Sequence, residues 1–252
     1  MLRLSTGLMD YLMAGGSLKQ AFTGGRLCIY SGSQPASADT AYAGTLLATI
    51  SLASATWSAE TAAYGIVNFT GGGSGSLNTL TVNGVDVLGG AVSYSGSLAN
   101  TMVLVAAQVN AKNMSPHYKA SIPVAGAATM WLTAGPGLGT GPNTYTVAHT
   151  ETTITVTETN VANGVAGSGG LTFGNSASGT LSMSGVWSGV VLASDVAGWF
   201  RLYGPGADAG ALSTSLMRID GAILADMDMI NTSLTATKTL TIDQFDLTCS
   251  AY

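Results

Sequence analysis

The first residues show the spacing of short amphipathic helices. Leu8 and Leu12 stand one helical turn apart behind Ser5, a residue type that caps helix N-termini. A second helical turn is expected over 18–22, where Ser17 supplies the cap. The pattern therefore predicts two short helices before the first strand.

From residue 26 onward the pattern changes to the alternation of β-strands, separated by small polar residues. A one-residue slip at Asp243-Gln244 reverses the phase of the last alternating run and predicts a β-bulge. Asp220-Gly221 stands between two apolar runs and predicts a hairpin turn. Strands are expected at 27–29, 46–52, 65–70, 171–173, 180–187, 199–203, 216–219, 222–224 and 240–249.

Two glycine-rich stretches, 71–75 and 164–170, enclose a segment with its own set of elements. Asn83-Gly84 between short apolar runs predicts a type I′ hairpin. Behind Ser97, apolar residues recur at helical spacing and predict one amphipathic helix; its apolar face comprises Leu98, Met102, Val105, Ala106 and Val109. Strands are expected after it at 130–133, 145–148 and 152–159. This set predicts a small α+β domain.

The pattern as a whole predicts a mainly β protein of two domains. Residues 1–70 together with 171–252 are expected to form a β-sandwich or jelly-roll-like domain that carries short N-terminal helices. Residues 71–170 are expected to form the inserted α+β domain, connected through its glycine-rich hinges.

Composition narrows the functional classes. The 252 residues include 8 Lys+Arg and 13 Asp+Glu, so that charged residues make up 8% of the chain, against about 25% in an ordinary soluble domain. A formal net charge of −5 argues against a nucleic-acid partner, because nothing in the chain is basic enough to neutralise a phosphate backbone. A chain with so few charges has few means to prevent self-association, which favours a subunit whose neutral surface is covered by neighbours.

Targeting signals and cysteine chemistry add little. Asp10 and Tyr11 interrupt any apolar signal-peptide core, and no run approaches the roughly 18 apolar residues of a membrane span, so neither secretion nor membrane insertion is expected. Cys28 and Cys249 lie far apart in the sequence; two buried thiols are the simpler interpretation, and one disulfide bond is the alternative.

The residue types that carry catalysis form no convincing constellation, so no catalytic, cofactor or metal residue is assigned. His117 and His149 are the only imidazoles, and no Gly-x-Ser-x-Gly motif accompanies them. The glycine-rich run 135–141 lacks the Lys of a phosphate-binding loop, and Pro136 removes one amide donor.

Two further groups leave alternatives open. Acidic residues near the C-terminus are interpreted as polar positions of strands and turns, with a Ca²⁺ site as the alternative; they are Asp220, Asp226, Asp228, Asp243 and Asp246. Aromatic residues at alternating positions are interpreted as core, with a sugar-binding platform as the alternative; they are Trp57, Trp187, Trp199, Phe200 and Tyr203.

Several stretches resemble virion proteins of tailed bacteriophages. The stretches are Leu2-Arg3-Leu4-Ser5-Thr6-Gly7-Leu8, the run 29–39, 44–48, Gly198-Trp199-Phe200-Arg201-Leu202-Tyr203 and Leu240-Thr241-Ile242-Asp243-Gln244-Phe245. The run 81–88 of the insert is similar to a small module of various phage structural and tail proteins. The resemblance covers most of the chain, implies a virion part and carries no reaction.

Composition and resemblance together lead us to expect a non-enzymatic virion structural protein, assembled in the cytoplasm of the bacterial host. The favoured form is a capsid decoration or cement protein that binds the major capsid protein as a symmetric oligomer, with a trimer favoured. The first alternative is a tail component, a fibre, tip or adaptor subunit, that contacts a host receptor through the insert. The second alternative is a secreted carbohydrate-binding β domain, for which Trp187 and Trp199 would be the residues to test.

Overall fold

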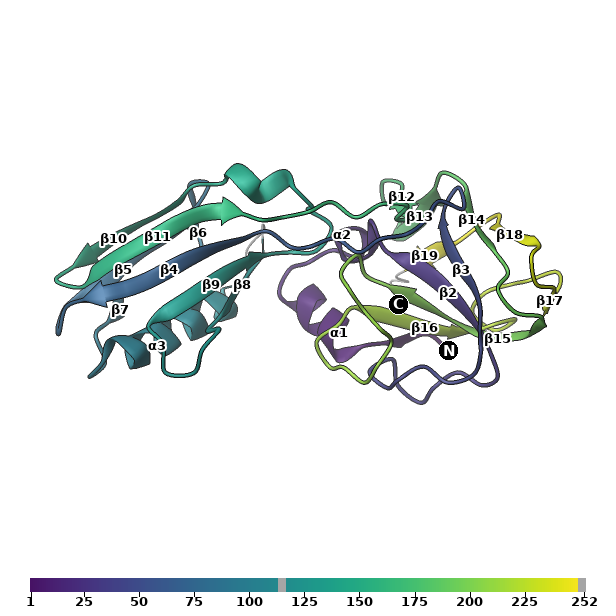
Figure 1. Cartoon of the computed structure of the whole chain (residues 1–252), viewed down its shortest axis with the longest axis horizontal. Helices are drawn as coiled ribbons and strands as arrows, with labels where there is room; N and C mark the ends of the chain where they lie inside the picture. Colours follow the sequence, from purple (N-terminus) through teal and green to yellow (C-terminus); the bar gives the residue numbers. More distant parts are fainter. Residues whose placement is uncertain (113–116, 249–252) are drawn as a thin grey trace. The chain divides into compact units, whose positions relative to one another are not determined.

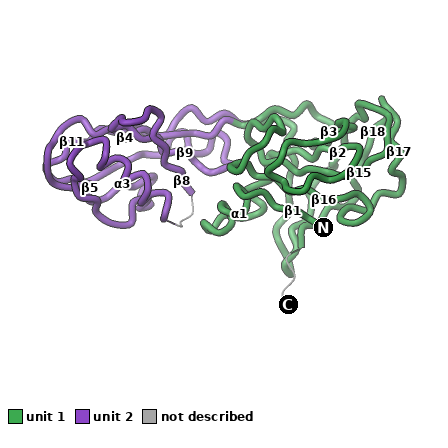
Figure 2. Tube along the Cα trace, turned by 90° about the horizontal axis from the view of Figure 1, so that it is seen from below, with its two compact units in different colours: residues 1–60, 167–252 green, residues 61–166 purple. Residues whose placement is uncertain are grey.

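The computed structural model describes residues 1–112 and 117–248, and the chain folds into two compact units (Figure 2). Unit 1 is formed by residues 1–60 and 167–252, and unit 2 by residues 61–166. The mainly β class expected from the sequence is confirmed. The division falls earlier than the expected boundary at 70/71, because the strand β4 (Tyr64–Gly71) pairs with strands of unit 2.

Unit 1 is built on one large antiparallel sheet (Figure 1). Its strand order is β1-β16-β15-β2-β3-β14-β18, and the short strand β17 pairs with β15. The bounds are β1 Arg3–Leu4, β2 Arg26–Ser31, β3 Leu46–Leu52, β14 Trp187–Val190, β15 Asp195–Tyr203, β16 Arg218–Ala222, β17 Ser233–Leu234 and β18 Thr239–Ile242.

The large sheet is covered on both faces. One face packs against the helices α1 (Thr6–Met13) and α2 (Leu18–Phe22) and against a small sheet of order β12-β13-β19, with bounds Thr172–Phe173, Thr180–Ser184 and Asp246–Thr248. Leu27 and Ile29 of β2 belong to this core, whereas Cys28 and Tyr30 belong to a second cluster on the opposite face. Burial on both faces explains why Leu27 to Ser31 are all buried rather than alternately exposed.

The two N-terminal helices form as the sequence predicts. The side chain of Ser5 accepts a hydrogen bond from the Leu8 N–H and begins α1, and that of Ser17 accepts one from the Gln20 N–H and begins α2. Gly15 follows the end of α1 with a φ of +85°, a left-handed conformation that favours glycine.

Three local predictions for unit 1 are wrong. The run 180–187 is split into β13 and β14 at Gly185, whose φ of +77° turns the chain from the small sheet into the large one. Asp220-Gly221 lies inside β16 and makes no hairpin turn; a Cβ at Gly221 would stand 2.3 Å from the Phe200 ring, so glycine here makes room for an aromatic side chain. The phase change at 243–244 is not a bulge, because β18 pairs with β14 whereas β19 pairs with β13.

Unit 2 packs two antiparallel sheets and one helix around its own core. One sheet has the order β11-β4-β9-β8; the other has the order β10-β5-β6, with β7 paired to β5. The bounds are β5 Ser76–Val82, β6 Val85–Asp86, β7 Val92–Ser93, α3 Leu98–Ala111, β8 Tyr118–Ser121, β9 Thr129–Ala134, a 3₁₀ turn η1 Gly141–Thr144, β10 Val147–Thr152 and β11 Thr155–Ala162.

The strongest signals of the insert are confirmed. Asn83 and Gly84 have φ angles of 50° and 78° and connect the paired strands β5 and β6, as a type I′ turn requires. α3 begins behind Ser97, whose side chain accepts from the Asn100 N–H, and the apolar face predicted for the helix is buried except at Leu98, which is partly buried. The sequence pattern did not reveal β8.

The glycine-rich stretch 71–75 does not connect the two units, because it lies inside unit 2, whereas the stretch 164–170 spans the boundary between them. Residues 71–75 connect β4 to β5 inside unit 2, with φ angles of +101° at Gly72 and +95° at Gly75. At the other stretch, a Cβ on Gly167 would lie 2.5 Å from the Ser58 carbonyl oxygen. Glycine at these positions permits tight turns and close backbone approach.

Candidate functional site

The imidazole of His149 in unit 2 lies between two carboxylates. Its Nε2 is 3.0 Å from Glu151 on the same strand, and its Nδ1 is 2.9 Å from Glu158 on β11. With each ring nitrogen facing a carboxylate, His149 connects β10 to β11, which belong to different sheets. His117 directly precedes β8 and lies next to residues 113–116, which are outside the described part of the chain.

The glycine-rich run 135–141 forms the connection between β9 and η1. Beside it, the side chain of Asn143 accepts from the Gly164 N–H at 2.6 Å and donates to the Gly164 carbonyl at 2.9 Å. These two hydrogen bonds hold Asn143 against the backbone of Gly164. The run 135–141 is a connecting loop, as the absence of a phosphate-loop Lys indicated.

The aromatic side chains of unit 1 are core residues, and this interpretation is confirmed for four of the five. Trp187, Trp199 and Phe200 have no exposed surface, and Tyr203 is 1% exposed. Trp57 is partly buried and lies against the Arg26 guanidinium, 4.0 Å from the ring centroid. A sugar-binding platform on Trp187 and Trp199 is therefore wrong, because a sugar stacks only on an exposed ring face.

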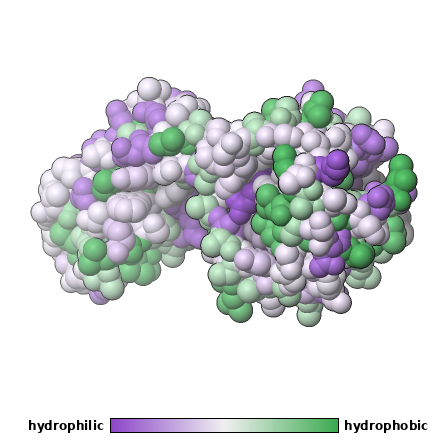
Figure 3. Space-filling model, turned by 45° about the vertical axis from the view of Figure 1, so that its right-hand side comes forward, coloured by the Kyte–Doolittle hydropathy of each residue, from purple (hydrophilic) through white to green (hydrophobic). Residues whose placement is uncertain are grey.

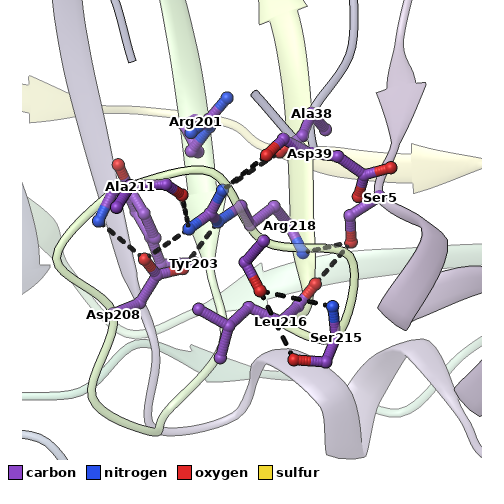
Figure 4. Close-up of polar contacts among 12 residues, drawn as sticks. Ser5, Ala38, Asp39, Arg201, Tyr203, Asp208, Ala211, Ser215, Leu216 and Arg218 are labelled. Carbon is purple, nitrogen blue, oxygen red and sulfur yellow. Dashed lines mark hydrogen bonds and ion pairs between the residues drawn. The ribbon is translucent and has the colours of Figure 1, made fainter. Parts of the chain in front are cut away.

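Two buried ion pairs support one face of the large sheet. Figure 4 shows the pair between Arg218 and Asp208. Arg201 of β15 donates two hydrogen bonds to Asp220 of β16, at 2.6 and 2.7 Å. Arg218 donates two bonds of 2.7 Å to Asp208, and it also donates to the carbonyl of Ala211. Buried charges of this kind are tolerated only when they are paired and fully hydrogen-bonded.

The same network fixes the loops that cover this face. Arg218 donates to the Ala38 carbonyl, and the Asp39 carboxylate accepts from the N–H and the hydroxyl of Thr6 at 2.9 and 2.7 Å. The loop before β3 and the loop before β16 are thereby held to the sheet, and Ser5 joins them by accepting from the Arg218 N–H at 2.9 Å. We assign this cluster a structural role, since its charges are satisfied internally.

Two of the C-terminal acidic residues are engaged in separate contacts. Asp220 belongs to the buried pair with Arg201, and Asp226 accepts from the N-terminal amine at 2.7 Å and from the Ala222 N–H at 2.9 Å. Burial raises the pKa of Asp226, but these hydrogen bonds outweigh it and the pKa is lowered. Among the described residues, no three His, Cys, Asp or Glu side chains are grouped so that they could hold a metal ion.

A cavity of about 530 Å³ opens in unit 1 beside β18 and β19. Its lining combines apolar and acidic side chains; the apolar members are Leu2, Phe200, Met227, Met229, Ile230, Leu240, Ile242, Phe245 and Leu247, and the acidic ones are Asp226, Asp228, Asp243 and Asp246. Hydrogen bonds from Ser182 and Gln244 lower the pKa of Asp246. We call this feature the 226–247 cavity.

Exposed apolar side chains surround the 226–247 cavity. Ile230 is fully exposed, Leu224 is 67% exposed and Leu2 is 42% exposed. Figure 3 shows that hydrophobic residues reach the surface of the chain in patches among largely neutral ones. Patches of this kind, next to a cavity, are typical of interaction surfaces.

Sequence reasoning identified the aspartates of this region but missed the cavity. The available signal was the alternation of acidic and apolar residues from Asp226 to Ile230, which places apolar side chains beside the carboxylates. Cys28 is buried, 3.8 Å from the Thr49 hydroxyl, as expected of a buried thiol. Cys249 lies outside the described residues, so the interpretation of two buried thiols, with one disulfide bond as the alternative, stays a prediction.

Comparison with known proteins adds no identity to this geometry. No family model, no curated protein and no solved structure matches the chain. Within the described part of the chain, no helix has the length and apolar character needed to cross a membrane.

Proposed function

We propose that the chain is a non-enzymatic structural protein of a tailed-bacteriophage virion, a capsid decoration protein that binds the major capsid protein as a symmetric oligomer. The observation that carries the proposal is the apolar surface around the 226–247 cavity, on a chain of which 8% of the residues are charged. Such a surface favours a neighbour that covers it.

The interior of unit 1 supports a mechanical role. Its large sheet is buried on both faces, and two buried ion pairs hold the covering loops in place. A rigid unit of this kind presents the same docking surface on every copy, which is what a symmetric lattice requires. The sequence resemblance to tailed-phage virion proteins supports the same function.

The test is the copy number of the chain in purified particles, measured by quantitative mass spectrometry against the major capsid protein. A decoration protein is expected in a fixed lattice stoichiometry, and particles that lack it should lose capsid integrity at a lower temperature. Absence of the chain from purified particles would overturn the proposal.

A second candidate is a tail component, because unit 2 has a complete core of its own and can carry a separate binding task. The copy-number measurement separates the two functions. A tail component is expected in far fewer copies than the major capsid protein, and its removal should impair adsorption while heads remain normal.

A further inference from the structure

The small sheet of unit 1 ends in a strand that has an available edge next to the 226–247 cavity. In the order β12-β13-β19, β19 pairs with β13 on one side, and within the described residues no strand pairs with it on the other. Asp246 and Leu247 of β19 also line the cavity, so the strand edge and the cavity are parts of one surface.

We propose that β19 receives, as an added strand, an extended segment of another protein in which apolar residues alternate with Lys or Arg. The inference rests on the proposed function in that it places this partner in the virion. Strand addition joins the backbone of a bound segment to a sheet edge, while pockets beside the edge select its alternate side chains.

The alternation along β19 defines what the added strand must present. Leu247 is buried in the core, whereas Asp246 and Thr248 on either side of it are exposed. Residues of an added strand follow the same alternation. An apolar residue beside Leu247 would therefore enter the cavity, and a basic residue beside Asp246 would meet a carboxylate.

The cavity has the size and the lining for apolar side chains. Its volume of about 530 Å³ lies within the range of roughly 300–1,000 Å³ common for binding pockets. Met227 and Met229 contribute flexible side chains to its wall, and such side chains adapt to different apolar partners.

The charge around the cavity points to a basic partner. Asp228, Asp243 and Asp246 are exposed residues of its lining, and the residues found to line it include no Lys or Arg. Opposite charges on the two partners speed association and fix the register. The partner must therefore supply the cations.

A second copy of this chain does not fit the requirement. Its 8 Lys and Arg residues are scattered singly, and no stretch of the sequence alternates basic with apolar residues. Two of them, Arg201 and Arg218, are wholly buried in the ion pairs of unit 1. We therefore infer that the added strand comes from a different protein.

The probe is a capped synthetic peptide of about ten residues in which Val and Lys alternate, a length that corresponds to one long strand. Its affinity for the full chain is measured by calorimetry, and hydrogen exchange locates the contact. We expect binding that weakens with salt, together with slower exchange of the β19 amides. A peptide with Glu in place of Lys should bind at least about tenfold more weakly.

Two further measurements separate strand addition from loose electrostatic attraction. A peptide N-methylated at alternate residues cannot bond along one edge and should lose about tenfold in affinity or more. The double variant Asp243→Asn with Asp246→Asn should lose about fivefold and show a weaker salt dependence. Its matched control, Asp10→Asn with Asp195→Asn, changes two exposed carboxylates that do not line the cavity and should bind as the native chain does.

The proposal is overturned if the Val-Lys peptide does not bind, if N-methylation leaves its affinity unchanged, or if both double variants lose affinity equally. These results do not depend on particle composition. A chain that is present in particles but does not bind the peptide keeps the proposed function and loses this inference. A chain that binds the peptide as expected but is absent from particles keeps the strand-addition site and loses the virion partner.

Discussion

Arg201 and Asp220 stand directly opposite each other on β15 and β16, and two hydrogen bonds join their wholly buried charged groups. Removal of water from both charges is costly, and their mutual attraction offsets that cost only while both partners are present. The pair therefore defines how β15 and β16 meet, because a shift in register would leave a charge unpaired inside the protein.

We predict that Asp220→Ala lowers the free energy of unfolding of unit 1 by about 3–5 kcal/mol, since Arg201 would remain buried without its carboxylate. The double variant Arg201→Met with Asp220→Leu should cost less, because it removes both charges. Denaturant unfolding of a Trp131→Phe background measures this, as the remaining tryptophans all lie in unit 1. The control Asp195→Ala changes an exposed carboxylate. A loss below about 1 kcal/mol for Asp220→Ala, typical of a surface pair, would contradict the prediction.

The side chain of Ser5 makes three hydrogen bonds at a position with no exposed surface. It accepts from the N–H groups of Leu8 and Arg218 and donates to the Leu216 carbonyl at 2.7 Å. We predict that Ser5→Ala destabilises unit 1 by about 1–3 kcal/mol, because it removes a helix cap and leaves buried groups unpaired.

The matched control for Ser5 is Ser17→Ala. Ser17 also caps a helix, but its bond to the Gln20 N–H is exposed to solvent, which can replace it. Its loss should cost less than about 1 kcal/mol in the same unfolding measurement. Equal losses for the two variants would show that the buried bonds of Ser5 contribute nothing beyond ordinary capping.

The sequence correctly predicted those features that depend only on interactions between residues close together in the chain. The caps at Ser5, Ser17 and Ser97 and the turn at Asn83-Gly84 each depend on residues a few positions apart, and each is present in the structure. Such features follow from backbone geometry and short-range hydrogen bonds.

The sequence-based predictions that proved wrong depend on residues far apart in the sequence. Asp220-Gly221 resembles a turn locally, but Arg201 and the Phe200 ring, about twenty residues away in the sequence, require an acid and a glycine inside a strand. Likewise, β18 and β19 belong to two different sheets because β18 pairs with β14 whereas β19 pairs with β13, and both partners are distant in the sequence. The 226–247 cavity depends on the same long-range packing, which is why only its aspartates were singled out in the sequence.

The boundaries of unit 2 predict how the chain can be shortened. Removal of residues 61–166, with Glu60 joined to Gly167 by a short Gly/Ser linker, should leave unit 1 folded because its core and sheet contain no residue of that segment. The near-UV circular dichroism of the tryptophans in unit 1 measures this. A shortened chain without that signal would contradict the independence of unit 1.

A different excision serves as the comparison. Removal of 72–169 deletes Ser168 and Gly169, whose carbonyls accept from the N–H groups of Ser58 and Leu52, and it leaves β4 without the strands it pairs with. We expect this version to be less stable than the first one in thermal unfolding. Equal stability of the two would place the boundary at the glycine-rich stretches rather than at residues 60 and 167.

Gly75 and Gly73 lie two residues apart in the connection between β4 and β5, and they predict opposite outcomes. Gly75 has a φ of +95°, and a Cβ there would lie 1.8 Å from the Thr152 carbonyl oxygen. Gly73 has open space around the position of a Cβ.

We predict that Gly75→Ala destabilises unit 2 by about 3 kcal/mol, through backbone strain and the displacement of β10. Gly73→Ala should be neutral or stabilising by up to about 1 kcal/mol, because it restricts the unfolded chain. Hydrogen exchange of the β5 and β10 amides in the full chain measures both effects. Similar exchange in the two variants would show that the Thr152 contact does not determine the turn.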